Sequence, residues 1–195
     1  MARTIGLITE LEVVNSVLSV AGDNPVQSLN DEYQPVFIIK QMLNNISRDM
    51  QTKNYWFNTE YDVTLSPNTL TDKINLPFNI LHFEPTDTRY VARGLTVYDR
   101  VSRTSTITAD ITADICVMLE FDELPQVARK YIQAMCKMQY NDEYQNEDSL
   151  KRTLANEVNE AKINLDRTHT ENEDINILAS GRSNAIAFKN RRRGS

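Results

Sequence analysis

Three carboxylates crowd one short turn and are the residues of this sequence best placed for acid–base chemistry: Glu120, Asp122 and Glu123. A glycosidase needs two carboxyl groups about 5 to 9 Å apart across a sugar-binding cleft, and residues spaced like these can meet that distance. The same residue types also cap helices and place favourable charge at a helix N-terminus. Because a long helical pattern follows, we interpret Asp122 as the helix cap and Glu123 as part of the turn. Pro125 then falls in the first helical turn, where its missing backbone donor costs nothing.

The rest of the sequence offers no catalytic constellation. The two histidines, His82 and His169, are far apart, and Gly-x-Ser-x-Gly, His-Glu-x-x-His, Walker and Cys-x-x-Cys patterns are absent. Cys116 and Cys136 fall on a predicted strand and a predicted helix, where buried reduced thiols are commoner than a disulfide or a metal site. We therefore expect no catalytic residue, no cofactor and no bound metal.

Composition limits the remaining classes of function. The chain has 195 residues and a net charge of −6, which argues against tight, sequence-independent DNA binding. Its 5 glycines are too few for glycine-rich phosphate loops. No apolar run approaches the roughly 20 residues of a membrane span, so we expect no membrane anchor. Residues 1–20 include Glu10 and Glu12 and lack the apolar core of a signal peptide.

Helical periodicity is found in two parts of the chain, the first sixty residues and the residues that follow the acidic turn. Thr9 and Glu12 fit a capping box, and Gly22 is placed to end that helix. A second helix is predicted from a cap at Asn30 or Asp31 to about residue 53. The third and fourth helices carry apolar residues at three- and four-residue steps. These are Leu124, Val127, Ala128, Tyr131, Met135 and Met138 in the third, and Leu150, Leu154, Val158, Ala161 and Leu165 in the fourth.

Phe37 and Ile38 lie off the apolar stripe of the second helix, which comprises Val36, Ile39, Met42, Leu43, Ile46 and Met50. Apolar residues in such positions are minor core contacts in a monomer and can form a subunit interface in an oligomer. The sequence leaves both alternatives open.

Strand-like alternation occupies the middle of the chain. Short strands are predicted at residues 61–65, 74–76, 80–83, 89–91, 95–98 and 115–119, with a hairpin turn at Arg93-Gly94. Serial short strands favour an antiparallel meander. The predicted fold is therefore α+β, a four-helix bundle with an inserted small antiparallel β domain. Its predicted divisions are 1–58 and 121–170 for the two halves of the bundle, 59–120 for the β insertion and 171–195 for a basic arm.

One aromatic cluster marks the passage from helix to sheet. Tyr55, Trp56 and Phe57 are consecutive and follow the second helix. Such a cluster can stack on a ligand, but its place between helix and strand favours packing of the hinge between two lobes.

Five segments, taken in order, resemble one known protein family. They are VN at 14–15 with LSVAGDNPVQSL at 18–29, YWFN at 55–58, LPF at 76–78 followed by IL at 80–81, YVARGLTVYDR at 90–100, and FDELP at 121–125 with Arg129 and Tyr131-Ile132. Together they resemble the tail tubular protein A family of short-tailed bacteriophages like T7, the adaptor between portal and tail nozzle. The likeness spans about residues 9–135, and beyond about Asp142 only the general character agrees.

The resemblance implies a structural virion protein, made in the host cytoplasm and assembled as a dodecameric ring in the phage tail. It implies contacts with the portal protein on one side and with the nozzle (tail tubular protein B) and tail fibre proteins on the other. Genome DNA would pass through the lumen without specific binding. A net acidic subunit suits such a conduit, because phosphate contacts would slow ejection.

Three functions remain open at this stage. The first is a structural connector without chemistry. The second is a carbohydrate-active hydrolase of cell wall or capsule, acting during phage entry through acids such as Glu120 and Glu123. The third is a host-derived helical regulator.

The C-terminal residues 181–195 carry five cations and no acid. Basic arms often bind nucleic acid, but this one lacks interleaved aromatic residues for base stacking beyond Phe188. We expect it to contact the portal instead, with an apolar anchor beside basic residues that pair with portal acids. The predicted portal-contact residues are Ile186, Phe188, Arg191, Arg192 and Arg193.

Overall fold

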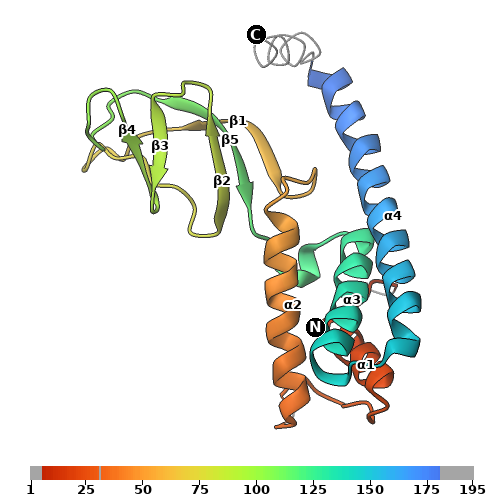
Figure 1. Cartoon of the computed structure of the whole chain (residues 1–195). Helices are drawn as coiled ribbons and strands as arrows, with labels where there is room; N and C mark the ends of the chain where they lie inside the picture. Colours follow the sequence, from red (N-terminus) through yellow and green to blue (C-terminus); the bar gives the residue numbers. More distant parts are fainter. Residues whose placement is uncertain (1–5, 31, 181–195) are drawn as a thin grey trace.

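Two helices, five strands and two further helices follow one another along residues 6–30 and 32–180, which the computed structural model describes (Figure 1). The α+β fold predicted from the sequence is confirmed. The elements are α1 (Glu10–Ala21), α2 (Gln34–Gln51), β1 (Thr59–Leu65), β2 (Ile80–Pro85), β3 (Tyr90–Arg93), β4 (Thr96–Asp99), β5 (Ile111–Val117), α3 (Gln126–Tyr140) and α4 (Asp148–Ser180), with a 3-10 turn at Phe121–Glu123 and a π-helical turn at Asn141–Gln145.

The ends of α1 follow the predicted local signals. The Thr9 hydroxyl accepts the Glu12 N–H, and the Glu12 carboxylate accepts the Thr9 N–H, which completes the capping box. Gly22 ends the helix at φ 75°, in the left-handed region that favours glycine.

Helix α2 begins later than a cap at Asn30 predicts. Its N-cap residue is Tyr33, which makes no side-chain capping bond, and Pro35 lies in the first turn. The predicted Asn30 cap is therefore wrong, while Asp31 lies outside the described residues. Proline fixes this helix start by its own backbone geometry, without help from a capping side chain.

Helix α3 likewise begins after the residue predicted to cap it. Asp122 belongs to a separate 3-10 turn, whose capping pair is Glu120 and Glu123, and the N-cap of α3 is Pro125 itself. The physical reason is the proline, because the residue before it avoids the helical region. Leu124 is extended at ψ 145°, so a helix capped by Asp122 cannot continue into α3.

Helix α3 stands in the middle of the helical body and packs against α1, α2 and α4 (Figure 1). Of its predicted apolar stripe, Ala128 is buried and Val127, Tyr131 and Met135 are partly buried against the core. The prediction missed the more deeply buried Ile132, Ala134 and Cys136. Because α3 has neighbouring helices on several sides, it buries more than one stripe of side chains. Burial also raises the pKa of the Cys136 thiol to about 12.

The apolar stripes of α2 and α4 agree with the sequence. All six stripe residues of α2 are buried, as are Leu154, Ala161 and Leu165 of α4. Ile38 is a partly buried core contact, whereas Phe37 is 69% exposed, so a minor core role is excluded for Phe37. Helix α4 runs to Ser180, past the predicted arm boundary at residue 170, and residues 181–195 lie outside the described part of the chain.

The β domain is not a simple meander. Strand β5 lies between β1 and β2 in an antiparallel sheet, and β3 and β4 form a separate hairpin. The predicted strand at 74–76 makes only an isolated bridge between Asn75 and Thr96, because a turn and Pro77 confine it. The predicted hairpin is present, but its turn residues are Gly94 and Leu95, because Arg93 still belongs to β3 and pairs with Thr96. Gly94 has φ 59°.

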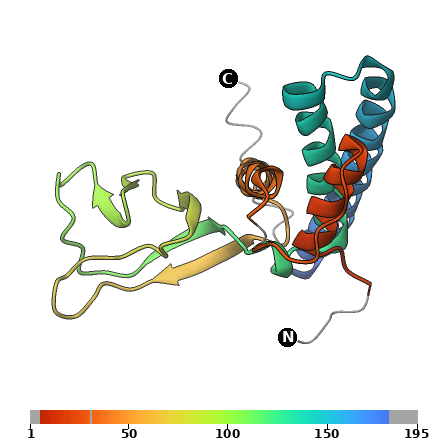
Figure 2. The same cartoon turned by 90° about the horizontal axis from the view of Figure 1, so that it is seen from below.

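Each lobe has its own hydrophobic core. The larger core lies among the helices and includes Tyr55 and Phe121 from the connecting segments. The smaller core lies in the β domain and comprises Ile74, Leu76, Val97, Ile107 and Ile111. Seen from below, α2 stands between the β domain and the other three helices (Figure 2). In residues 6–30 and 32–180, no helix is long and apolar enough to cross a membrane.

Amide hydrogen exchange is expected to show the strand amides of the β domain opening at lower free energy than the amides of residues 127–138, by at least about 1 kcal/mol. The smaller core and the short strands of the β domain are the reason. Equal protection of the strands and of α3 would show a single cooperative unit and would contradict two separately stabilised lobes.

Candidate functional site at the junction of the two lobes

Two buried carboxamide side chains lie in the connection between α2 and the first strand of the sheet. Gln51, the last residue of α2, and Asn58, just before β1, have exposed fractions of 0% and 1%. Burying polar groups this deeply costs free energy unless each finds a hydrogen-bond partner. Both carboxamides have partners at the other end of the β insertion as well as nearby, whereas the Asn58 Oδ1 is buried without a hydrogen-bond partner among the described residues.

The Gln51 side chain pairs with the backbone of Leu119. Its Nε2 donates to the Leu119 carbonyl at 3.0 Å, and its Oε1 accepts the Leu119 N–H at 2.8 Å. The same Nε2 also donates to the Ser47 hydroxyl one turn earlier, at 3.1 Å. A single side chain therefore makes the two-bond pairing that a strand neighbour makes, and it fixes the chain that leaves the sheet against the helix that enters it.

Asn58 joins the same two segments one step closer to the sheet. Its side-chain Nδ2 donates to the backbone carbonyls of Gln51, at 2.9 Å, and Val117, at 3.1 Å. The backbone carbonyl of Asn58 accepts the Val117 N–H. The Cys116 thiol donates to the Gln51 carbonyl at 3.4 Å. Burial raises the pKa of Cys116, so the thiol stays protonated as a donor. We call Gln51, Asn58 and these backbone partners the junction network.

The predicted hinge aromatics pack directly beside the junction network. The rings of Tyr55 and Phe57 stack at 5.5 Å, and Trp56 meets Phe57 edge-on at 4.9 Å. His169 of α4 joins them, 5.2 Å from Tyr55 and 6.1 Å from Trp56 between ring centroids. Tyr55 is 3% exposed, and burial raises its pKa. The structure thus brings together all three aromatics and adds a histidine that the sequence did not connect with them.

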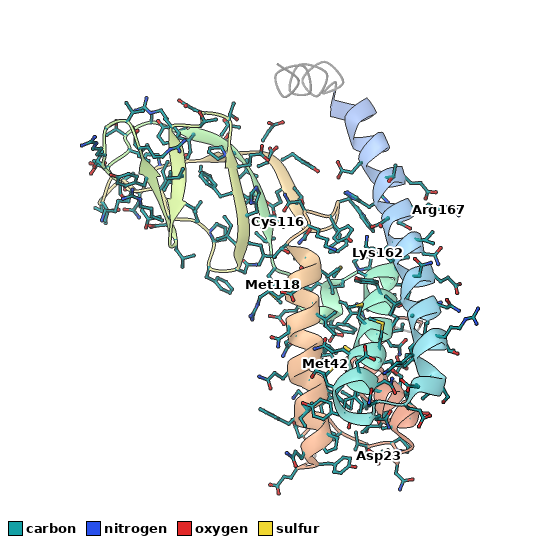
Figure 3. The ribbon with its side chains drawn as sticks, viewed as in Figure 1. Asp23, Met42, Cys116, Met118, Lys162 and Arg167 are labelled. Atoms are coloured by element: carbon teal, nitrogen blue, oxygen red, sulfur yellow. The ribbon has the colours of Figure 1, made fainter. Side chains whose placement is uncertain are left out.

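Helix α4 reaches beyond the helical body to support the β domain. The Tyr61 hydroxyl of β1 donates to the Glu173 carboxylate, at 2.9 and 3.0 Å from its two oxygens. Glu173 lies one turn beyond His169, on the same side of the helix. Lys162 of α4 and Cys116 of β5 mark the two sides of the junction in Figure 3. The orientation of the β domain is therefore held from two directions, by the junction network and by α4.

The acidic turn at residues 120–123 forms hydrogen bonds that involve its own backbone. The Glu123 carboxylate accepts the Glu120 N–H at 3.0 Å. Arg129, only 3% exposed, donates to the carbonyls of Leu124 and Ile8, at 2.7 and 2.8 Å, and to that of Asp122. Nearby, Glu10 has a raised pKa, first because it is partly buried and then because of the Asp122 charge. These contacts give the turn a structural role.

Other candidate residues are not brought to this site. His82 is exposed on β2, and the predicted portal-contact residues Ile186, Phe188 and Arg191–Arg193 lie outside the described residues. In the described part of the chain, no group of three His, Cys, Asp or Glu residues could hold a metal ion.

No structural role was predicted for Gln51, Asn58 or Arg129, although Asn58 and Arg129 lie in segments that carry the family resemblance. One signal for Gln51 was present, because it follows Ser47 by one turn, next to the buried positions Ile46 and Met50 of α2. A polar residue in such a position needs a partner, but nothing in the sequence says that the partner is Leu119.

Comparison with known proteins gives two findings. A family model described as "Tail tubular protein" matches residues 11–175, from α1 to the last turns of α4. A curated relative, "Tail tubular protein A" of Klebsiella phage KP34, is 24% identical over 170 residues, which cover 84% of this chain and 88% of the relative. The family match includes both lobes and the whole junction network.

Replacing Gln51 by leucine is expected to lower the free energy of unfolding by about 2 kcal/mol or more, because the Leu119 N–H and carbonyl both lose their partner. Urea denaturation measures this change. The matched control is Gln41→Leu, an exposed glutamine of the same helix, which should stay within about 0.5 kcal/mol of the unchanged protein. Equal effects of the two substitutions would show that the junction network contributes nothing to stability.

Proposed function

The chain belongs to the tail tubular protein family and is a structural component of a phage tail, and from this premise we propose that it is the adaptor that joins the portal to the tail nozzle and fibres. In this proposal the subunits form a ring, dodecameric in the virion, and the ring lines part of the channel through which the genome is ejected.

The junction network carries this proposal. An adaptor must hold two different surfaces in a constant relation, because its partners lie on opposite sides of it. Here the helical body and the β domain have separate cores, and Gln51 and Asn58 join them through buried, paired hydrogen bonds. Each lobe can then serve a different partner, the portal on one side and the nozzle protein and fibres on the other.

The charge of the chain supports a conduit for DNA. The net charge of −6 gives a subunit that repels phosphate, so the genome would pass through the lumen without specific binding. The location that follows is the tail of the virion, after synthesis in the host cytoplasm.

The C-terminal residues 181–195 are proposed to contact the portal. The described part of helix α4 runs to Ser180, at the end of the molecule away from the α1–α2 turn (Figure 1). Ile186 and Phe188 would be the apolar anchor, and Arg191–Arg193 would pair with acidic residues of the portal.

A hydrolase is the alternative, and the contacts of the acidic turn speak against it. The Glu123 carboxylate accepts the backbone N–H of Glu120, and the backbone carbonyl of Asp122 accepts a hydrogen bond from the Arg129 side chain. The family is structural, which fits a protein without enzymatic activity.

The purified protein is expected to show no turnover of peptidoglycan or capsular polysaccharide above background. The reason is that the sequence shows no known nucleophile–base pattern, and that the Glu123 carboxylate of the acidic turn already accepts the Glu120 N–H. A reducing-sugar assay measures turnover, with Glu123→Gln as the paired variant. Turnover that disappears in Glu123→Gln, while circular dichroism shows an intact fold, would replace the adaptor proposal with the hydrolase.

Full-length protein mixed with assembled portal is expected to cosediment with it and to appear as a ring in electron micrographs. Truncation after Ser180 should weaken this binding at least about tenfold, because burying two apolar side chains contributes about 3 kcal/mol or more.

The control replaces Arg191, Arg192 and Arg193 by glutamine and retains the apolar anchor, so that loss of charge and loss of the anchor are measured separately. If the truncated chain binds portal as tightly as the full chain, or if truncation weakens only DNA binding, residues 181–195 do not contact the portal. If full-length protein forms no ring on the portal, the adaptor proposal itself fails.

A further inference from the structure

One face of α2 is exposed along most of the helix. It carries Gln34, Phe37, Gln41, Asn44 and Arg48 at alternating three- and four-residue steps, and all five are exposed. We call these five residues the outer stripe of α2. Phe37 is 69% exposed, so most of its apolar surface is not covered by the rest of the chain.

The outer stripe is free of acid in a strongly acidic protein. The chain has 27 Asp and Glu residues, yet none lies between Glu32 and Asp49. The charged residues in this interval are Lys40 and Arg48. An aromatic anchor among neutral amides, with acidic charge excluded, is the composition found at the centres of protein interfaces.

The position of α2 decides which way the stripe faces. Its buried stripe packs into the helical core, so the outer stripe turns away from α1 and α3. Figure 2 shows α2 between those helices and the β domain, so the outer stripe faces the side over which the β domain extends.

Helix α4 lies on the other side of the helical body and has an apolar anchor of its own. Ile163 is 58% exposed, and the exposed acids Glu160 and Asp166 lie three residues before and after it. In the described residues, Phe37 of α2 lies near the cations Lys40 and Arg48, and Ile163 of α4 lies near the acids Glu160 and Asp166. Within its own helix Asp166 pairs with Lys162, and Arg167 pairs with Glu171, which leaves Glu160 as the acid beside Ile163 for which no ion pair is recorded among the described residues.

We propose that the outer stripe of α2 packs against α4 of a neighbouring copy around Ile163, with Lys40 and Arg48 of one subunit beside Glu160 and Asp166 of the next. This inference rests on the proposed ring and specifies its subunit contact. A ring of identical subunits needs a heterologous contact, in which two different faces meet. Copies with a net charge of −6 repel one another unless the contacting faces are complementary, and an acid-free stripe against an acid-bearing helix meets that condition.

Photo-cross-linking in complexes of the full chain with portal tests the contact. With p-benzoylphenylalanine in place of Phe37, we expect a product of twice the subunit mass, in which mass spectrometry finds the attachment on peptides that contain Ile163. The same probe in place of Ile163 should attach to peptides that contain Phe37. The matched control is the probe in place of Phe78, an 89% exposed phenylalanine of the β domain, which should not label the Ile163 peptides.

A charge exchange gives a second, independent readout. Arg48→Glu and Glu160→Arg should each lower the yield of the Phe37 cross-link about two- to fivefold, and the two together should restore it. Lys53→Glu is the control, because Lys53 is exposed but lies beyond the end of α2, and it should leave the yield unchanged.

The outcomes separate this inference from the adaptor proposal. Rings in which the probe at position 37 attaches only to portal, to another tail protein or to nothing would overturn the α2–α4 contact and leave the adaptor intact. Labelling of Ile163 peptides as strongly from position 78 as from position 37 would also overturn it, as would single charge variants without effect. If no ring forms on the portal, both fail together.

Discussion

The rest of the structure depends on the hydrogen bonds that Gln51 and Asn58 make across the junction. The β domain is inserted between α2 and α3, so two connecting segments link it to the helical body. Two covalent connections alone would allow the domain to rotate relative to the helices. The Gln51 carboxamide removes this freedom by pairing with both backbone groups of Leu119. The Asn58 Nδ2 adds a second link by donating to the backbone carbonyls of Gln51 and Val117. Because both side chains are buried, water cannot replace these bonds cheaply, and breaking them leaves polar groups unpaired. Two modest carboxamides therefore determine how the lobes are oriented.

The aromatic cluster and α4 protect this network. Tyr55, Trp56 and Phe57 lie between Gln51 and Asn58 in the sequence and pack in or against the helical core, and His169 of α4 contacts the rings of Tyr55 and Trp56. Further along the same helix, Glu173 accepts the Tyr61 hydroxyl, so α4 braces β1 from outside the sheet. At the base of the junction, Arg129 ties the segment before α1 to the turn before α3. In the adaptor role proposed above, such a braced joint would let a force on one lobe reach the other without changing the angle between them.

The arrangement of the helices determines which of them form the outer sides of the helical body. Helix α3 is surrounded by its neighbours, which leaves α2 and α4 to form opposite sides of the helical body. Their exposed faces differ in charge as well as in position, since α2 carries no acid before Asp49 and α4 presents Glu160 and Asp166 around Ile163. In the proposed ring, such a division would let subunits with a net charge of −6 meet. The acidic turn, which first suggested chemistry, belongs instead to the frame that positions α3.

The sequence by itself determined those features whose physical cause lies within about one helical turn. The Thr9–Glu12 capping box, the Gly22 helix end, the Gly94 hairpin and the buried stripes of α2 and α4 all arise from neighbours along the chain, and all were predicted. The α+β fold follows from the change of period between these segments. Only the tertiary structure decided that β5 lies between β1 and β2, and that Gln51 pairs with Leu119, 68 residues away. Periodicity shows which face of a strand or helix is buried but not which distant segment covers it. The start of α3 lies between these cases: Pro125 was visible in the sequence, but its effect on Leu124 outweighed the capping signal of Asp122.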